Sequence, residues 1–218
     1  MMARISLLPL LFALLVSSFA DEPAIRVDDE CKFSADIPVV EDYLRLITFS
    51  DPYKGNFDAG VTVIEYFDPN CPHCKTLHPI MNEVIADQGE DARFFMIPFV
   101  LWQYSVPQAE ALFVAGQDGK YFEMLDAQYE RQKPGGLTFD ELVQIAVEIG
   151  LDKDVFKSRM EKGLNQRMIM ARRQEISELG IRGTPSVMIN GKFVASDSKS
   201  TACITELIER EVAALEQG

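Results

Sequence analysis

Apolar and polar residues follow two different periods along this chain of 218 residues, and the changes of period mark the expected elements. Residues 61–67, Val-Thr-Val-Ile-Glu-Tyr-Phe, are rich in β-branched and aromatic side chains, which is typical of a buried strand. Residues 93–100 are crowded with apolar side chains and predict a second strand. Strand patterns return at 186–189 and 192–195, and Asn190-Gly191 between them predicts a type I′ hairpin turn.

A helical period replaces the strand pattern over most of the middle of the chain. The turn sequence at 68–70 is followed by Pro72, which favours the first turn of a helix. Thr138 and Glu141 form a capping box, and Gly150 ends the helix that follows. Further helices are expected at 108–117, 119–131, 153–162, 165–179 and 200–215, with weak helical periodicity over 39–49. This order predicts an α/β fold, in which helices flank a central mixed sheet and a helical segment is inserted midway.

The first twenty residues have the layout of a secretory signal peptide. Arg4 precedes an apolar run over 5–16, and the small residues Ser18 and Ala20 suit cleavage after Ala20. An uncleaved anchor is the weaker alternative, because Pro9 interrupts the run and a membrane span needs about 20 apolar residues. We therefore expect an exported protein in an oxidising compartment, with the periplasm favoured since the last residues are not an endoplasmic-reticulum retention signal.

Composition limits the partners and the number of domains. The formal net charge of −13 repels nucleic acid and anionic lipid, so neither is expected as a partner, and the charge itself is best explained as keeping an exported domain soluble. With 47% apolar residues, the chain has enough material for one full core. We expect a signal peptide at 1–20, an N-terminal extension at 21–57, and one domain at 58–218 with the helical insertion at about 104–180.

The candidate chemistry lies in the sequence Cys-Pro-His-Cys at 71–74, at the expected start of a helix. A redox cysteine must be ionised near neutral pH, and the free N–H groups of a helix N-terminus favour a thiolate at Cys71. Cys74 lies one turn deeper on the same face, where it can resolve a mixed disulfide. His73 can place a donor or a positive charge beside the Cys71 sulfur, and a more stable thiolate makes the disulfide a stronger oxidant.

Two other uses of the motif are weaker. Zinc is disfavoured because the chain has a single Cys-x-x-Cys pair, and the only histidines are His73 and His78, so no metal or other cofactor is expected. A purely structural disulfide gains little from closing so short a loop. His78 follows the motif and is expected to be an ordinary surface residue. Cys31 and Cys203 remain, either bonded to each other in an oxidising compartment or as two separate buried thiols.

The pair of motifs Cys-Pro-His-Cys at 71–74 and Arg-Gly-Thr-Pro-Ser-Val-Met-Ile-Asn-Gly at 182–191 resembles the thioredoxin superfamily, and within it the DsbA-like envelope oxidoreductases. The resemblance covers about residues 58–215 and implies a thioredoxin fold with an inserted helical domain. It implies that Pro72 and His73 tune the reactivity of the dithiol. It also implies that Pro185 is a cis proline facing the dithiol, and that the backbone at Gly183 and Thr184 pairs with a substrate chain.

The resemblance also assigns a role to Glu65, which stands where the family has a buried acid that exchanges a proton with Cys74. The alternative is that Glu65 points to solvent at the end of its strand. Thr184 departs from the valine of the strongly oxidising members and is more similar to the disulfide isomerases. Those proteins assemble through an N-terminal module, for which the segment before residue 58 is short.

The sequence therefore predicts a periplasmic enzyme, a thiol–disulfide oxidoreductase that introduces disulfides into exported proteins. Its expected partners are reduced or misfolded exported proteins as substrates and a membrane redox protein that resets the dithiol, and the expected state is a monomer. An isomerase or reductase of the same fold is the first alternative. A thioredoxin-fold chaperone or binding module, in which the dithiol is incidental, is the second.

Overall fold

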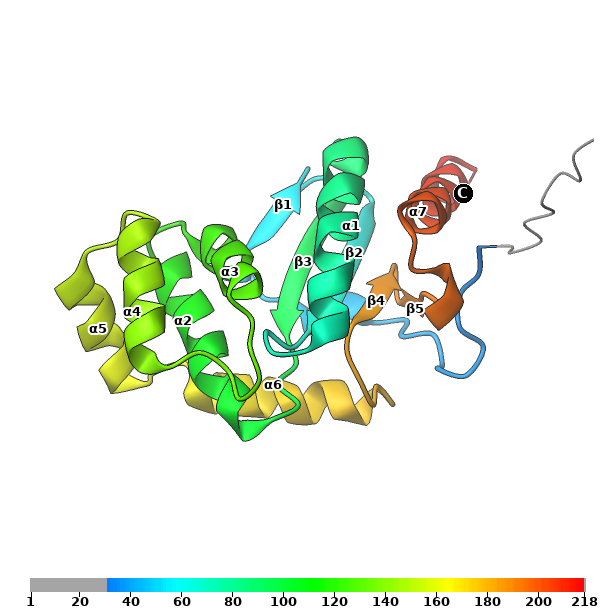
Figure 1. The fold of residues 1–218 in the computed structure, drawn as a ribbon. Coiled ribbons are helices and arrows are strands. Elements are labelled where there is room, and N and C mark those ends of the chain that lie inside the picture. Colours follow the sequence, from blue (N-terminus) through cyan, green and yellow to red (C-terminus); the bar gives the residue numbers. More distant parts are fainter. Residues whose placement is uncertain (1–30, 218) are drawn as a thin grey trace, which may run out of the picture.

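A computed structural model describes residues 31–217, and a five-stranded mixed sheet forms its centre (Figure 1). The strands lie in the order β1-β3-β2-β4-β5. Their bounds are β1 Tyr53–Gly55, β2 Val61–Phe67, β3 Ala92–Pro98, β4 Ser186–Ile189 and β5 Lys192–Phe193. Every residue of β2 is buried, because this strand has neighbours on both edges and helices over both faces. β2 runs parallel to β3 and antiparallel to β4, so that Glu65 lies opposite both Met96 and Val187.

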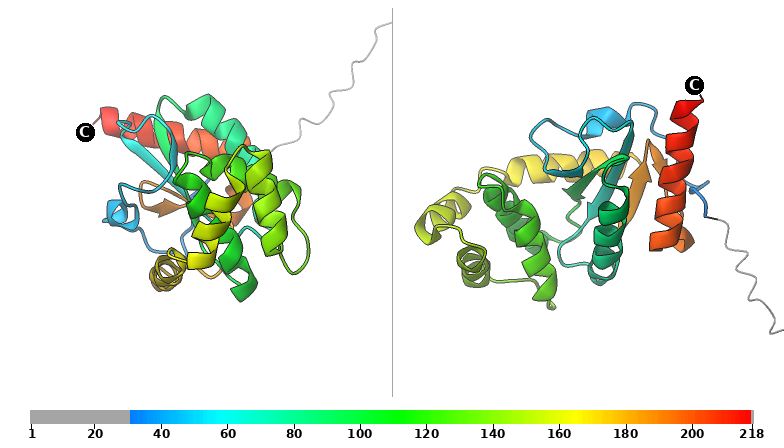
Figure 2. Two further views of the ribbon diagram at one scale, coloured as in Figure 1. Left: turned by 90° about the vertical axis from the view of Figure 1, so that its left-hand side faces the viewer. Right: turned by 90° about the horizontal axis from the view of Figure 1, so that it is seen from above.

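The two faces of the sheet are covered by different helices, as the two views of Figure 2 show. Successive side chains of a strand alternate between faces, so Val63, Glu65 and Phe67 share one face of β2. That face packs under α1 Pro72–Gln88 and α7 Thr201–Glu216. Ile64 and Tyr66 pack on the opposite face, which is covered by α6 Gln166–Glu178 and the short 3-10 helix Tyr43–Leu46. The helix that begins at the cysteine motif therefore packs on the face of the sheet that carries Glu65.

The helical insertion forms a lobe beside the sheet (Figure 1). It consists of a 3-10 turn at Gln103–Ser105, α2 Val106–Gly116, α3 Tyr121–Glu130, α4 Phe139–Glu148 and α5 Lys153–Lys162, followed by α6. The capping box expected at the start of α4 is present, since Thr138 and Glu141 hydrogen-bond each other's backbone N–H groups. The Tyr121 hydroxyl donates to the carbonyl of Met96 on β3 at 2.9 Å, which fastens the lobe to the sheet. The expected α/β thioredoxin fold with a helical insertion is confirmed.

The sheet begins earlier in the chain than the expected domain boundary at residue 58. Strand β1 pairs antiparallel with the edge of β3, although it lies in the segment 21–57 that was expected to be an extension. A three-residue edge strand is too short to show alternation in the sequence. Gly55 takes a left-handed φ of 83°, and a Cβ there would lie 2.3 Å from the carbonyl oxygen of Ala92. Within the weak helical pattern at 39–49, the structure has only the 3-10 helix Tyr43–Leu46.

The signal peptide expected at 1–20 lies outside the described residues. Within residues 31–217, no helix combines the length and the apolar character that crossing a bilayer requires.

Candidate active site

A buried carboxylate holds the turn that presents the cysteines. The Asp68 carboxylate accepts hydrogen bonds from the N–H of Asn70 at 2.7 Å, the N–H of Leu101 at 2.6 Å and the Ser105 hydroxyl at 2.8 Å. Burial raises the pKa of Asp68, and these donors oppose that rise. Because two of the donors belong to the loop that enters the insertion, Asp68 fixes the motif against the helical lobe. Cys71 then occupies the N-cap position of α1.

Cys71 has the environment of a reactive thiol. It takes an extended conformation at the N-cap, and Pro72 begins the helix, so unpaired N–H groups face the sulfur. Its thiol donates to the Thr184 carbonyl at 3.3 Å. The hydrogen bond from Cys74 lowers the pKa of Cys71 to about 5, with smaller contributions from the Thr184 side chain and from the N–H groups of His73 and Cys74, while burial opposes the shift. At neutral pH this sulfur is therefore a thiolate when reduced.

Cys74 has the opposite character. It lies fully buried on the first turn of α1, and burial raises its pKa above that of an ordinary thiol. The hydrogen bond with Cys71 and the charge of Glu65 act in the same direction. The two cysteines of the motif thus differ strongly in acidity, and Cys74 needs a nearby base before it can attack as a thiolate.

Glu65 lies on the face of β2 that α1 covers, and it is the acid whose charge acts on Cys74. Its side chain is only 2% exposed, so the alternative in which it points to solvent is wrong. Its Oε2 atom makes no hydrogen bond with any described residue. Burial raises the pKa of Glu65 to about 8, and the positive charge of Lys199 partly opposes the rise. A carboxyl group with this pKa can accept and return a proton near neutral pH.

The segment at 183–185 faces the start of α1. The Thr184–Pro185 peptide bond is cis, and the segment leads directly into β4. Together with Gly183 and His73 it lines a cavity of about 750 Å³ beside the dithiol. The structure thus brings Cys71, Pro72, His73, Cys74, Glu65, Gly183, Thr184 and Pro185 together at one end of α1.

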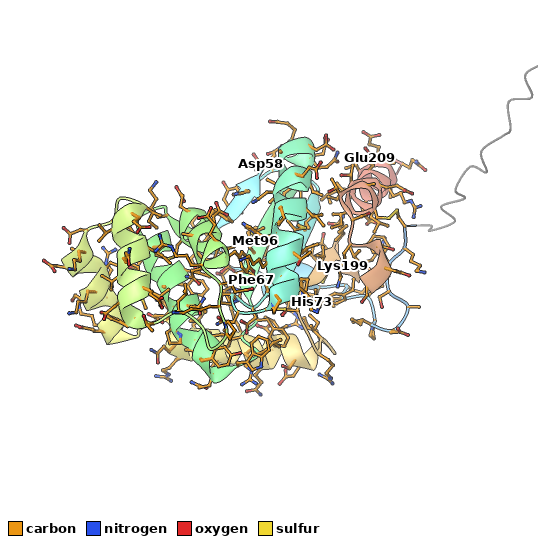
Figure 3. The ribbon with its side chains drawn as sticks, viewed as in Figure 1. Asp58, Phe67, His73, Met96, Lys199 and Glu209 are labelled. Atoms are coloured by element: carbon orange, nitrogen blue, oxygen red, sulfur yellow. A yellow bond between two sulfur atoms is a disulfide. The ribbon has the colours of Figure 1, made fainter. Side chains whose placement is uncertain are left out.

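Two further residues take part in this site and were not predicted. The Lys199 ammonium donates to the Pro185 carbonyl at 2.7 Å, and Figure 3 shows it on the segment beside α1, with His73 at the start of that helix. Burial lowers the pKa of Lys199, while negative charge on Cys74 and Glu65 raises it. Gln132 of the insertion donates to the carbonyls of Pro69 and Cys71, at 3.0 and 3.1 Å. Neither residue lies in a motif, so only the folded chain reveals them.

The expectation that His78 is a surface residue is wrong. Its ring is buried, stands 4.8 Å from the ring of Tyr129, and hydrogen-bonds to Asp126 at 2.6 Å. Since it lies four residues after Cys74, it occupies the same inward side of α1, which the insertion helix α3 covers. The Tyr129 hydroxyl is also buried and has no hydrogen-bond partner among the described residues.

Cys31 and Cys203 form a disulfide bond with each other, with a Cα separation of 5.0 Å. The bond joins the start of the described chain to the first turn of α7. Cys71 and Cys74 are both free thiols in this structure. Among residues 31–217 there is no cluster of three or more His, Cys, Asp or Glu side chains arranged to hold a metal ion.

The fold and the site together define a class of protein. A mixed sheet, a Cys-x-x-Cys motif at the start of the helix after a central strand, and a cis proline facing it are the features of the thioredoxin superfamily, here with the helical insertion of its DsbA-like members. Residues 48–210, more than half of the chain, match the family model described as Thioredoxin. The chain belongs to this family.

Solved structures support the same fold. The thiol-disulfide exchange protein α-DsbA2 of Wolbachia pipientis is 23% identical, with a TM-score of 0.66 over 79% of this chain and 91% of that one. BdbD of Bacillus subtilis is 22% identical, with a TM-score of 0.66 over 75% of this chain and 94% of that one. A thioredoxin-like oxidoreductase of Silicibacter pomeroyi is 24% identical, with a TM-score of 0.66 over 79% and 98%. At these identities the likeness is one of fold.

The chain is also similar to one part of each of several much longer proteins. It is 28% identical over 182 residues to Na(+)/H(+) antiporter NhaA 1 of Salinispora arenicola, which is 78% of this chain and 26% of the antiporter. A match to NhaA 1 of Mycobacterium sp. strain KMS covers 65% of this chain and 24% of that protein at 28% identity. The chain therefore spans about a quarter of the length of these curated relatives, and their name describes the whole proteins.

Proposed function

We propose that this protein is a thiol–disulfide oxidoreductase that oxidises pairs of cysteines in exported proteins. One observation carries the proposal: a thiol with a pKa of about 5 lies at the start of α1, opposite Thr184 and Pro185, with a high-pKa thiol one turn deeper. A stable Cys71 thiolate favours the reduced form, and so makes the Cys71–Cys74 disulfide a strong oxidant.

The proposed reaction moves two electrons from substrate to enzyme. A substrate thiolate attacks the Cys71 sulfur of the oxidised enzyme, which forms a mixed disulfide and expels Cys74 as a thiolate. A second substrate thiolate attacks the substrate sulfur of that mixed disulfide, which completes the substrate disulfide and releases Cys71 as a thiolate. Glu65 supplies the proton that Cys74 takes up, and accepts it again when a redox partner reoxidises the pair.

The substrate chain would lie in an extended conformation along the segment at 183–185. The free edge at Thr184, next to the start of β4, is suited to main-chain pairing, and the Thr184 carbonyl already contacts Cys71. Pro72 and His73 stand on the exposed side of Cys71, where His73 lines the cavity and can stabilise the thiolate. No cofactor is needed, because the disulfide itself carries the electrons.

We place the enzyme in the periplasm, on the basis of the signal-peptide pattern at 1–20 and the oxidising compartment that the Cys31–Cys203 disulfide requires. Its substrates would be reduced or misfolded exported proteins, and a membrane redox protein would restore the Cys71–Cys74 disulfide. We propose that it acts as a monomer.

A disulfide isomerase or reductase is the second candidate, and Thr184 is the observation that favours it. Threonine at this position is more similar to the isomerases, and its side chain acts on both thiols of the motif. Such an enzyme would be kept reduced by its partner. A thioredoxin-fold chaperone would use the same surface without the thiols.

Redox equilibration of the Cys71–Cys74 pair against glutathione separates these candidates. A disulfide donor should have a potential well above the value of about −270 mV that is typical of thioredoxin. A potential near that value would support the reductase or isomerase. The Cys71→Ala, Cys74→Ala variant should lose all oxidation of reduced peptides. Unchanged protection of unfolded proteins from aggregation by this variant, together with no peptide oxidation by the natural protein, would support the chaperone.

A further inference from the structure

The cavity beside the dithiol has an unusual distribution of charge. Its floor is apolar and is formed by Ile37, Leu77, Ile80 and Ile181. Three of its polar residues carry basic groups, namely His73, Arg182 and Lys199, and none of the described residues that line it is Asp or Glu. The chain as a whole contains 34 acidic residues against 21 Lys and Arg. A cavity without acids is therefore an exception on this surface, and it lies where a substrate chain would bind.

The lysine and the arginine of the cavity retain unused donors. Lys199 uses one of its three ammonium hydrogens on the Pro185 carbonyl, and Arg182 donates to the Ser177 carbonyl at 2.8 Å. Neither forms an ion pair with a carboxylate among residues 31–217. Arg182 is exposed and Lys199 is half-buried, so both can meet a charged group that enters the cavity.

Acidic residues lie near the lining residues, but none of them lines the cavity itself. Asp197 follows the lining residue Ser196 and pairs with Lys32 at 2.9 Å. Glu83 accepts a hydrogen bond from the Thr201 hydroxyl at 2.8 Å. Glu65 lies beneath α1 and is largely uncharged at neutral pH, since burial raises its pKa to about 8. Asp197 is thus paired with a cation, Glu65 is largely uncharged, and Glu83 does not line the cavity, so the charged groups of the lining are all basic.

We propose that this cavity selects substrate segments that carry a carboxylate side chain and an apolar side chain close to the reacting cysteine. The apolar side chain would cover the floor, and the carboxylate would lie between Lys199 and Arg182. The inference rests on the proposed function, and it names the class of polypeptide that the enzyme oxidises fastest. The net negative charge of the protein repels an acidic segment elsewhere on the surface. The basic groups of the cavity would therefore direct such a segment to the place beside Cys71.

Three synthetic peptides test the proposal. Each carries two cysteines and one leucine, and they differ only in having Glu, Gln or Lys at the positions next to the first cysteine. The oxidised protein is mixed with each reduced peptide, quenched by acid, alkylated and analysed by mass spectrometry. The Glu peptide should react about fivefold to tenfold faster than the Lys peptide at low salt, and the ratio should shrink in 1 M salt.

Substitutions assign the preference to the cavity. Lys199→Met and Arg182→Gln should each lower the Glu-to-Lys rate ratio about twofold to threefold, and Lys199→Arg should retain it. Lys153→Gln removes the same charge from an exposed position on α5 and should leave the ratio unchanged. Arg182 is exposed, so its variant remains informative if Lys199→Met fails to fold.

The outcomes are distinct. Equal rates for the three peptides at low salt would overturn the charge preference while leaving the oxidase proposal intact. A preference that survives both the Lys199 and the Arg182 substitution would show that another surface selects the substrate. Failure to oxidise any of the peptides would reject the proposed function, and the inference that rests on it.

Discussion

At the scale of single residues, the site depends on two groups whose pKa values move in opposite directions. Burial raises the pKa of Glu65 to about 8, whereas the hydrogen bond from Cys74 lowers that of Cys71 to about 5. Each pKa shift makes the free energy of unfolding depend on pH. Between about pH 4.5 and 8 the folded protein holds a proton on Glu65 that the unfolded chain releases, so this residue lowers stability as the pH rises. Cys71 binds its proton more weakly when folded and has the opposite effect.

The Glu65→Gln variant isolates the first of these effects. The glutamine side chain cannot ionise, so the variant should be more stable than the natural protein by about 3 to 5 kcal/mol at pH 8.5, with a difference near zero at pH 4.5. Urea unfolding of both reduced proteins at several pH values measures the difference directly. Glu209→Gln, at an exposed position on α7, should change stability little at any pH. A Glu65→Gln difference that is independent of pH would show that Glu65 has the same pKa in the folded and the unfolded protein.

At the scale of elements, a buried ion pair fastens the segment before β1 to helix α6. Arg172 on α6 donates to both carboxylate oxygens of Asp51, at 2.6 Å each, and the two side chains are 12% and 5% exposed. Asp51 also accepts from the N–H and the hydroxyl of Thr48. Helix α6 leads to the segment at 183–185, where the substrate would bind. The Asp51–Arg172 pair therefore fixes the position of the helix before that segment, relative to the edge of the sheet.

Removal of one member of this pair should destabilise the protein strongly. Arg172→Met leaves the Asp51 carboxylate buried without its counter-ion, which we expect to cost about 3 kcal/mol or more in the free energy of unfolding. Arg173→Met, at the exposed neighbouring position, should change it by about 0.5 kcal/mol or less. The Asp51→Asn, Arg172→Met double variant should lose less than the sum of the two single losses. Additive losses in chemical denaturation would show that the two charges act independently.

The elements that sequence patterns reveal are those with a local cause. The run at 61–67 and the capping box at Thr138 carry their signals in adjacent residues, and both elements begin where expected. Strand β1 has no local signal, because it depends on the edge of β3. The spacing of four residues from Cys74 indicates the side of α1 on which His78 lies, but its burial depends on helix α3. The segment 21–57 was therefore assigned as an extension, whereas its last part completes the sheet.

At the scale of the whole molecule, the site is assembled from segments far apart in the chain. The Cys71–Cys74 motif could be predicted from the sequence, because the spacing of the thiols and the helix start are local. Lys199 lies more than a hundred residues away, on the turn before α7, and reaches the site only when β4 and β5 place that turn beside α1. Sequence patterns cannot show such a contact, and this is why the charge of the cavity emerges only from the structure.

The Cys31–Cys203 disulfide acts at this largest scale, because it links the start of the described chain to α7 across 172 residues. A cross-link over so long a loop restricts the unfolded chain strongly, so Cys31→Ala, Cys203→Ala should lower the free energy of unfolding by about 2 to 5 kcal/mol. Both residues are buried, so mild reductant should open the Cys71–Cys74 disulfide well before this one.

Denaturant titration measures the stability loss, and peptide oxidation below the unfolding transition measures the effect on the site. We expect the double variant to oxidise the Gln peptide at a rate within about twofold of the natural protein, since the bond contributes to stability and lies outside the reacting pair. A tenfold loss of rate in the folded variant would instead show that α7 and the turn carrying Lys199 need this cross-link to hold the site. The disulfide would then be a part of the active-site scaffold.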